Sequence, residues 1–133
     1  DLHSFPTRRS SDLVQRRAEL DAWLASPLEP QAVKDPLLAR VFFAARLGHE
    51  RVDELLAEAE ERFRLEKEAL EAIDIDVVDL DTALKAAVLR YGIDGAKTQL
   101  EWVARTRRAV AADAAGTRSK AAETAGATGE ETR

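Results

Sequence analysis

Two residues of this chain have the spacing of metal ligands. His49 precedes Asp53 by four positions, which places both side chains on one face of a helix. A metal site needs more convergent ligands than this pair, with hydrogen bonds that orient them. The chain has no cysteine, and its other histidine is His3. We therefore interpret His49 as a helix-start or surface residue and expect neither a metal nor a cofactor.

A group of glutamates could supply paired catalytic carboxylates. They fall on the polar face of a predicted helix, where carboxylates are solvated like those of any protein surface. Catalysis requires a cleft that shifts their pKa values. The sequence also contains no Gly-rich phosphate loop and no serine nucleophile elbow. We predict that the chain is not an enzyme. The glutamates concerned are Glu58, Glu60, Glu61, Glu66 and Glu68.

Arginine and tryptophan residues offer two further kinds of binding. Arg105, Arg107 and Arg108 could contact DNA phosphates, but we favour a role near a predicted helix C-terminus, where cations oppose the helix dipole. Trp23 and Trp102 could line a ligand pocket. Their spacing within helical patterns favours packing in a core or an interface.

Composition limits the partners that this chain can have. The net charge is −5, which argues against a DNA-binding surface here, because affinity for nucleic acid depends on cationic neutralisation of phosphates. No apolar run is long enough to span a membrane. The absence of cysteine fits a reducing compartment, so we predict a cytoplasmic protein.

The hydrophobic pattern predicts an all-α fold, a small antiparallel helical domain with a long C-terminal helix. We expect helices over about 15–25, 36–47, from 50 onward, and from 80 or 82 to 111. Residues 74–79 alternate polar and apolar side chains, but no second strand exists to pair with them, so we interpret them as a connection. The predicted core is Leu20, Trp23, Leu24, Leu38, Val41, Phe42, Leu55, Leu56 and Phe63.

Helix ends are indicated by a few residues. Asp35 can cap a helix whose first turn holds Pro36, and Gly48 suits its end. Gly92 and Gly95 fall inside the last helix. They either allow close helix approach, or Gly92 ends one helix and Asp94 caps the next. The sequence leaves both alternatives open.

The last predicted helix carries two apolar stripes, whereas a surface helix of a monomer needs one. One stripe is Leu84, Val88, Tyr91, Thr98 and Trp102, and the other is Leu89, Ile93, Ala96, Leu100 and Val103. We predict that a second copy of the chain covers one of them. The alternative is a single broad face in a four-helix bundle. The predicted dimer interface is Leu84, Val88, Tyr91, Leu100 and Trp102.

Three segments follow from these patterns. Residues 1–13 match the translation of a common sequencing adapter, so we interpret them as a non-native scar, the alternative being a disordered arm. Residues 14–111 form the predicted helical dimerisation domain. Residues 112–133 have no apolar side chain larger than alanine, and we predict a disordered tail.

The order of motifs from Trp23-Leu24 through Asp35-Pro36 and Tyr91-Gly92 to Trp102-Val103 resembles the C-terminal helical domain of PadR-like transcriptional regulators. The resemblance spans about residues 14–110. It implies a truncated regulator that lacks its N-terminal winged helix. It further implies a homodimer that binds DNA only through the missing domain, with a small-molecule effector. The alternative is a stand-alone helical protein–protein interaction module.

Overall fold

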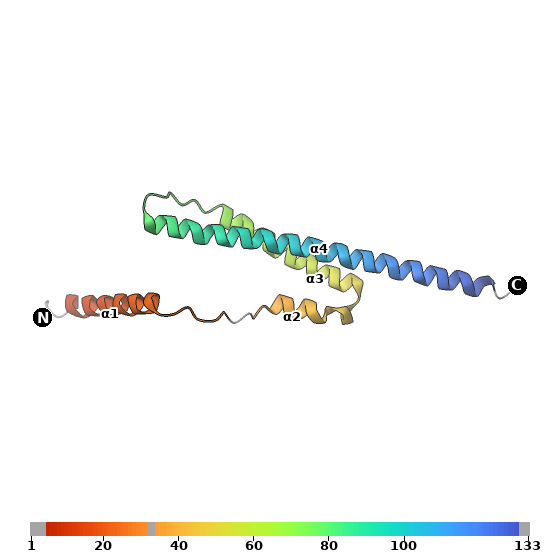
Figure 1. The fold of residues 1–133 in the computed structure, drawn as a ribbon, viewed down its shortest axis with the longest axis horizontal. Helices are drawn as coiled ribbons and strands as arrows, with labels where there is room; N and C mark the ends of the chain where they lie inside the picture. Colours follow the sequence, from red (N-terminus) through yellow and green to blue (C-terminus); the bar gives the residue numbers. More distant parts are fainter. Residues whose placement is uncertain (1–4, 32–33, 131–133) are drawn as a thin grey trace. The chain divides into compact units, whose positions relative to one another are not determined.

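The computed structural model describes residues 5–31 and 34–130. Within these ranges the fold is all-α, as predicted, and contains no strand (Figure 1). The chain divides between Lys34 and Asp35 into two compact units, which are described separately. The elements are α1 Phe5–Ala25, α2 Pro36–Phe43, the 3₁₀ helix η1 Ala44–Leu47, α3 His49–Glu71 and α4 Leu80–Glu130.

The first unit contains α1. This helix ends at Ala25, as predicted, because Pro27 disfavours a helical conformation in the residue before it. It begins earlier than expected, so residues 5–13 of the segment interpreted as a scar are helical. Their conformation does not test their origin, and residues 1–4 lie outside the described residues.

The apolar residues of α1 do not form a core. Leu20, Trp23 and Leu24 are 52%, 64% and 66% exposed, which corrects the prediction that they are buried. The physical reason is that α1 is the one helix in the described part of its unit, so no second described element of that unit covers it.

The second unit begins with a capped helix. The Asp35 carboxylate accepts hydrogen bonds from the backbone N–H groups of Leu37 and Leu38, at 2.9 and 3.3 Å, and Pro36 occupies the first turn of α2. The helical path continues through η1 to Gly48, whose positive φ of 81° suits glycine. The predicted helix over 36–47 therefore has the right extent, although its last turn is 3₁₀.

The predicted inner face of α2 is wrong by one residue. Leu37 and Val41 pack against the core and Ala44 is buried, whereas Leu38 and Phe42 are exposed. A shift of one position turns the face by about 100°. Because apolar residues occupy both sets of positions, the spacing alone could not distinguish them.

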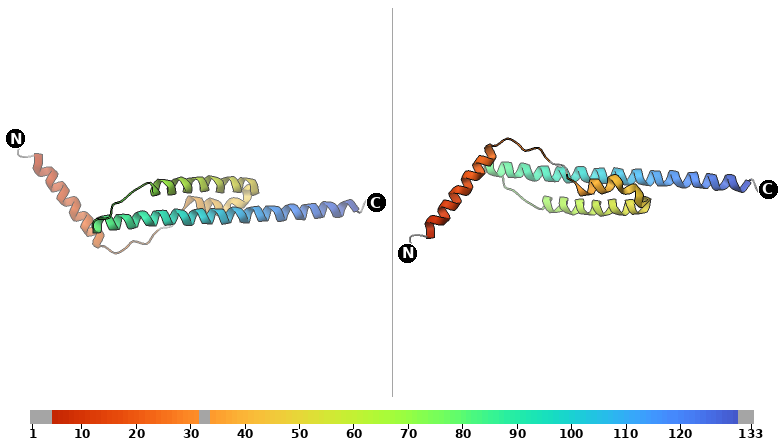
Figure 2. Two further views of the ribbon diagram at one scale, coloured as in Figure 1. Left: turned by 90° about the horizontal axis from the view of Figure 1, so that it is seen from above. Right: turned by 90° about the horizontal axis from the view of Figure 1, so that it is seen from below.

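α3 and α4 form an antiparallel hairpin and lie side by side (Figure 2). Leu56 and Val103 are fully buried between them, next to Ala59 and Phe63. Two other predicted core residues, Val41 and Leu55, are half-buried. Of the buried residues, the predicted core contained Leu56 and Phe63 and lacked the other five, Ala44, Ala59, Ile93, Ala96 and Val103.

The segment between α3 and α4 is a connection without a strand, as expected. It ends at Asp79, whose carboxylate accepts a hydrogen bond of 2.9 Å from the backbone N–H of Thr82 in the first turn of α4. This bond to the backbone is the main cause that lowers the pKa of Asp79, followed by the bond from the Thr82 hydroxyl.

α4 continues through Gly92 and Gly95 to Glu130, so of the two alternatives for these glycines the structure has one continuous helix and no break at Gly92. The disorder predicted from residue 113 onward is corrected up to residue 130, and residues 131–133 lie outside the described residues. The tail is rich in alanine, the strongest helix former, and it extends a helix that is already nucleated by packing.

No helix among the described residues combines the length and the apolar character that crossing a bilayer requires.

Candidate functional site

The histidine and aspartate with metal-ligand spacing have different partners. His49 Nε2 lies 2.7 Å from the Asp113 carboxylate of α4, whereas Asp53 contacts Arg107. His49 is the first residue of α3 and is exposed, the position expected for it. Within residues 5–31 and 34–130, no group of three or more potential ligands could hold a metal ion.

The glutamates of α3 form ion pairs along the helix surface. Arg64 contacts Glu61 at 2.6 Å and Glu68 at 2.7 Å, and the hydrogen bond that Arg64 donates to Glu61 is the main reason that the pKa of Arg64 is raised. Arg62 pairs with Glu66 at 3.7 Å. These side chains are exposed, and ion pairs at this spacing stabilise the helix.

Arg107 joins α3 to α4. Its guanidinium donates to both Asp53 carboxylate oxygens, at 2.9 and 3.1 Å, and to Glu60 at 2.6 Å. The hydrogen bond to Asp53 raises the pKa of Arg107, with Glu60 second, and the same bond lowers the pKa of Asp53. Because a planar guanidinium accommodates two oxygens of one carboxylate in a fixed geometry, this contact fixes how the two helices align.

The expected role of the arginine cluster is therefore corrected. We placed Arg105, Arg107 and Arg108 near a helix C-terminus, but α4 continues to Glu130, well beyond the last turn over which a dipole effect acts. Arg107 binds α3 instead, and Arg105 and Arg108 are exposed.

α4 carries two apolar seams with the spacing of a coiled coil, in which steps of four and three residues alternate. We call the first the inner seam, because Ile93, Ala96 and Val103 are buried in it. We call the second the exposed seam. The inner seam is Leu89, Ile93, Ala96, Leu100 and Val103, and the exposed seam is Leu84, Val88, Tyr91, Gly95, Thr98 and Trp102.

The exposed seam follows another side of α4 than the inner seam, and of its members Trp102 is half-buried against the core. Its first five members, from Leu84 to Thr98, each precede a residue of the inner seam by five positions, which corresponds to about 140° around the helix axis. Leu84, Val88 and Tyr91 are 59%, 73% and 80% exposed. The third face of the same helix stretch is charged and also exposed, with Arg90, Asp94, Lys97 and Glu101. The apolar character of the exposed seam is thus confined to one side of the helix.

Gly92 and Gly95 of α4 lie in different surroundings. A Cβ atom at Gly92 would approach Leu70 Cδ1 to 3.2 Å, so the absence of a side chain there permits close packing against α3. A Cβ atom at Gly95 would meet nothing within 4 Å. Glycine in a helix costs about 1 kcal/mol relative to alanine, and within this chain no contact accounts for that cost at Gly95.

The five predicted interface residues divide between the two seams. Leu84, Val88 and Tyr91 are available on the surface. Leu100 belongs to the inner seam and packs against the chain's own core, so its place in an interface is corrected. Trp102 is half-buried and also packs against that core. The sequence analysis treated Gly95 as a glycine inside a helix and did not include it in either stripe. The alternating steps of four and three residues place it in the exposed seam.

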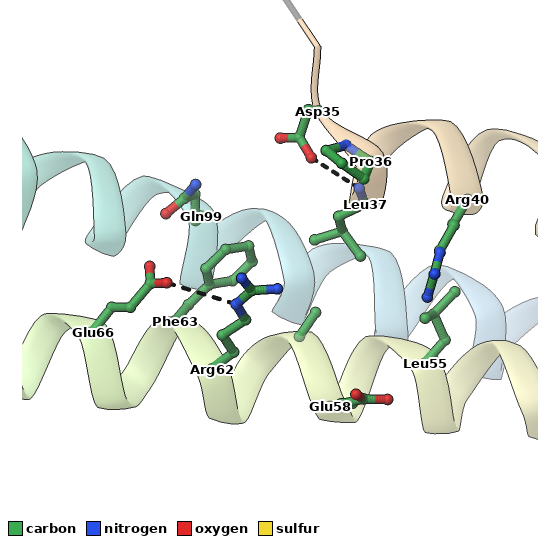
Figure 3. A pocket seen from close by; sticks show the side chains of 11 residues that line it. Asp35, Pro36, Leu37, Arg40, Leu55, Glu58, Arg62, Phe63, Glu66 and Gln99 are labelled. Carbon is green, nitrogen blue, oxygen red and sulfur yellow. Dashed lines mark hydrogen bonds and ion pairs between the residues drawn. The ribbon is translucent and has the colours of Figure 1, made fainter.

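A groove of about 380 Å³ lies where α2 meets α3 and α4 (Figure 3). Leu37, Leu55 and Phe63 contribute its apolar lining, and charged side chains surround it. Its volume lies within the range of small-ligand sites. However, its charges have mixed sign and three are engaged: Asp35 with the start of α2, and Arg62 and Glu66 with each other. The groove therefore indicates no particular ligand, and the effector implied by the resemblance stays a prediction.

Residues 33–111 match the family model described as virulence activator alpha C-term. No curated protein and no solved structure matches the chain. The PadR-like family expected from the sequence is therefore corrected, because the matching model is that of another family. The winged helix and the DNA partner were implied by that resemblance, and they no longer follow.

Proposed function

Because the chain belongs to the virulence activator alpha C-terminal family, we propose that it is a helical protein–protein interaction module that associates with a second copy of itself. The observation that carries this proposal is the exposed seam of α4. Three of its large apolar side chains are more than half exposed, and they repeat with the period that coiled-coil partners recognise.

The energetic argument rests on burial. Covering a valine or leucine side chain stabilises a complex by about 1.5–3 kcal/mol relative to leaving it in water. Leu84, Val88 and Tyr91 lie within two helical turns of one another, so a single partner helix can cover all three. A second copy presents the same surface, and a symmetric dimer requires one self-complementary patch on each subunit.

The proposed mode of action is binding and not catalysis. The ionised side chains of α3 pair along its solvated surface or with Arg107, which supports a structural role for them. The cytoplasmic location stays a prediction from the sequence.

Sedimentation equilibrium tests the self-association. We expect the unmodified chain to be dimeric and the double variant Leu84→Gln/Val88→Gln to dimerise at least about tenfold more weakly, since each tenfold corresponds to about 1.4 kcal/mol. The matched control is Arg90→Gln/Lys97→Gln, which introduces the same residue twice on the charged face of the same helix and should leave the dimer unchanged. A chain that stays monomeric at high concentration contradicts the proposal.

A further inference from the structure

We propose that two copies of α4 pair through the exposed seam in antiparallel orientation, with the two-fold axis beside residue 93. This inference rests on the proposed self-association and adds the direction and the register of the pairing. The order of large, small and charged residues along the seam supports it. When a second copy of the seam lies alongside in the reverse direction, Tyr91 is opposite Gly95, and Asp81 is opposite Arg105.

The centre of the seam indicates the direction most clearly. Tyr91 and Gly95 lie two residues on either side of position 93. Antiparallel pairing about that position places the Tyr91 ring of each copy over Gly95 of the other. Apart from the neighbouring backbone of α4, no described atom lies within 4 Å of where a Gly95 side chain would start, so the space for that ring is open. The pairing thus gives a reason for a glycine at this position.

The charged residues that continue the seam at its two ends also favour antiparallel pairing. Asp81 lies one step before Leu84 and Arg105 one step after Trp102, and both are exposed. They are equally far from residue 93, so antiparallel pairing places each Asp81 opposite Arg105 of the second copy. Asp81 already accepts from Lys85 at 2.7 Å, and a carboxylate has acceptor capacity for a further donor.

Parallel pairing is less favourable at the same positions. Each residue would then face its own copy, so that Asp81 meets Asp81 and Arg105 meets Arg105, and like charges placed opposite each other repel. Two tyrosines would meet at position 91, and two glycines would leave a gap at position 95. Gaps in a packed interface forfeit dispersion contacts on both sides.

Because the chain contains no cysteine, thiol cross-linking can read the register directly. Two single variants, Val88→Cys and Thr98→Cys, replace exposed residues of the seam. The antiparallel register places position 88 opposite position 98, while two copies of position 88 are about 15 Å apart along the helix. A short bifunctional thiol reagent should therefore link the mixture of the two variants and neither variant alone. A mass tag on one variant identifies the mixed product.

The outcomes separate the two proposals. Links within each single variant, or no link in any sample that sediments as a dimer, overturn the antiparallel register while self-association stands. Monomeric sedimentation of every sample overturns self-association itself.

Charge reversal gives an independent measurement. We expect Arg105→Glu to weaken the dimer by up to about tenfold and the double variant Asp81→Lys/Arg105→Glu to restore it, because only antiparallel pairing opposes these two positions. An unchanged dimer in the single variant contradicts the register.

Discussion

The two seams of α4 share one spacing and differ in what covers them. In the inner seam, Ile93, Ala96 and Val103 are buried against α3. In the exposed seam, Leu84 and Tyr91 face solvent. Coiled-coil spacing thus shows which residues share a face, and it leaves open whether the chain itself or another molecule supplies the partner. Opposite consequences for folding and for association should distinguish the two seams.

The largest expected effect is the loss of a side chain from the inner core. Leu56 is fully buried between α3 and α4, so Leu56→Ala should lower the free energy of unfolding by about 2–5 kcal/mol. Urea denaturation followed by circular dichroism measures this change. The comparison variant is Leu84→Ala in the exposed seam, with the same chemical change on the surface.

For Leu84→Ala we expect the monomer to unfold at nearly the same urea concentration, and the dimer to weaken. Equal destabilisation of the monomer by both variants would show that Leu84 is covered within its own chain, and the distinction between the seams would fail.

The second prediction contrasts the two glycines. Gly95→Ala should stabilise the monomer by about 1 kcal/mol, because alanine is the better helix former and the new methyl group meets nothing. Gly92→Ala should stabilise it less, because its methyl group lies 3.2 Å from Leu70 Cδ1. Thermal unfolding at low protein concentration measures both effects.

Association should respond in the opposite sense. Gly95→Ala removes the space proposed for Tyr91 of the second copy and should weaken the dimer, while Gly92→Ala should not. A Gly95→Ala chain that is more stable and equally dimeric would contradict the proposed packing at the axis.

Local signals predicted the element boundaries well. Asp35 and Pro36 specify the start of α2 through an N-cap and a fixed φ, and Gly48 supplies the positive φ directly after η1. These effects act within a few residues and are readable from sequence. Disorder after residue 112 was wrong because composition was judged by apolar content, and the helix propensity of alanine was not weighed.

Contacts between helices, and the side of each helix that faces the core, were harder to predict. Leu38 and Leu37 are chemically the same, and which of them faces the core depends on how α2 approaches the hairpin. The contact of Arg107 with Asp53 joins residues far apart in sequence, so no local pattern indicated it. The two stripes of α4 were evident from spacing, whereas the assignment of Leu100 to the inner one required the position of α3.

The smallest expected effect concerns the ion pair between Asp53 of α3 and Arg107 of α4. The hydrogen bond from Arg107 keeps the pKa of Asp53 below its ordinary value of 3.8. A carboxylate whose pKa is lowered in the folded state stabilises the fold above its unfolded pKa, and this contribution is lost as the pH falls below about 3.8. Asp79 should act in the same direction, because the backbone N–H of Thr82 lowers its pKa.

The variant Asp53→Asn should therefore unfold with a shallower dependence on pH in this acid range, while keeping the part due to Asp79. The control Asp94→Asn alters a carboxylate on the charged face of α4 and should follow the unmodified chain. Because Asp53 is close to the surface, solvent screens its pairing with Arg107, and the change should be smaller than either effect above. Thermal unfolding between about pH 2 and pH 5 measures it. If Asp53→Asn and Asp94→Asn give identical profiles, Arg107 aligns the two helices through geometry without a pH-dependent contribution to stability.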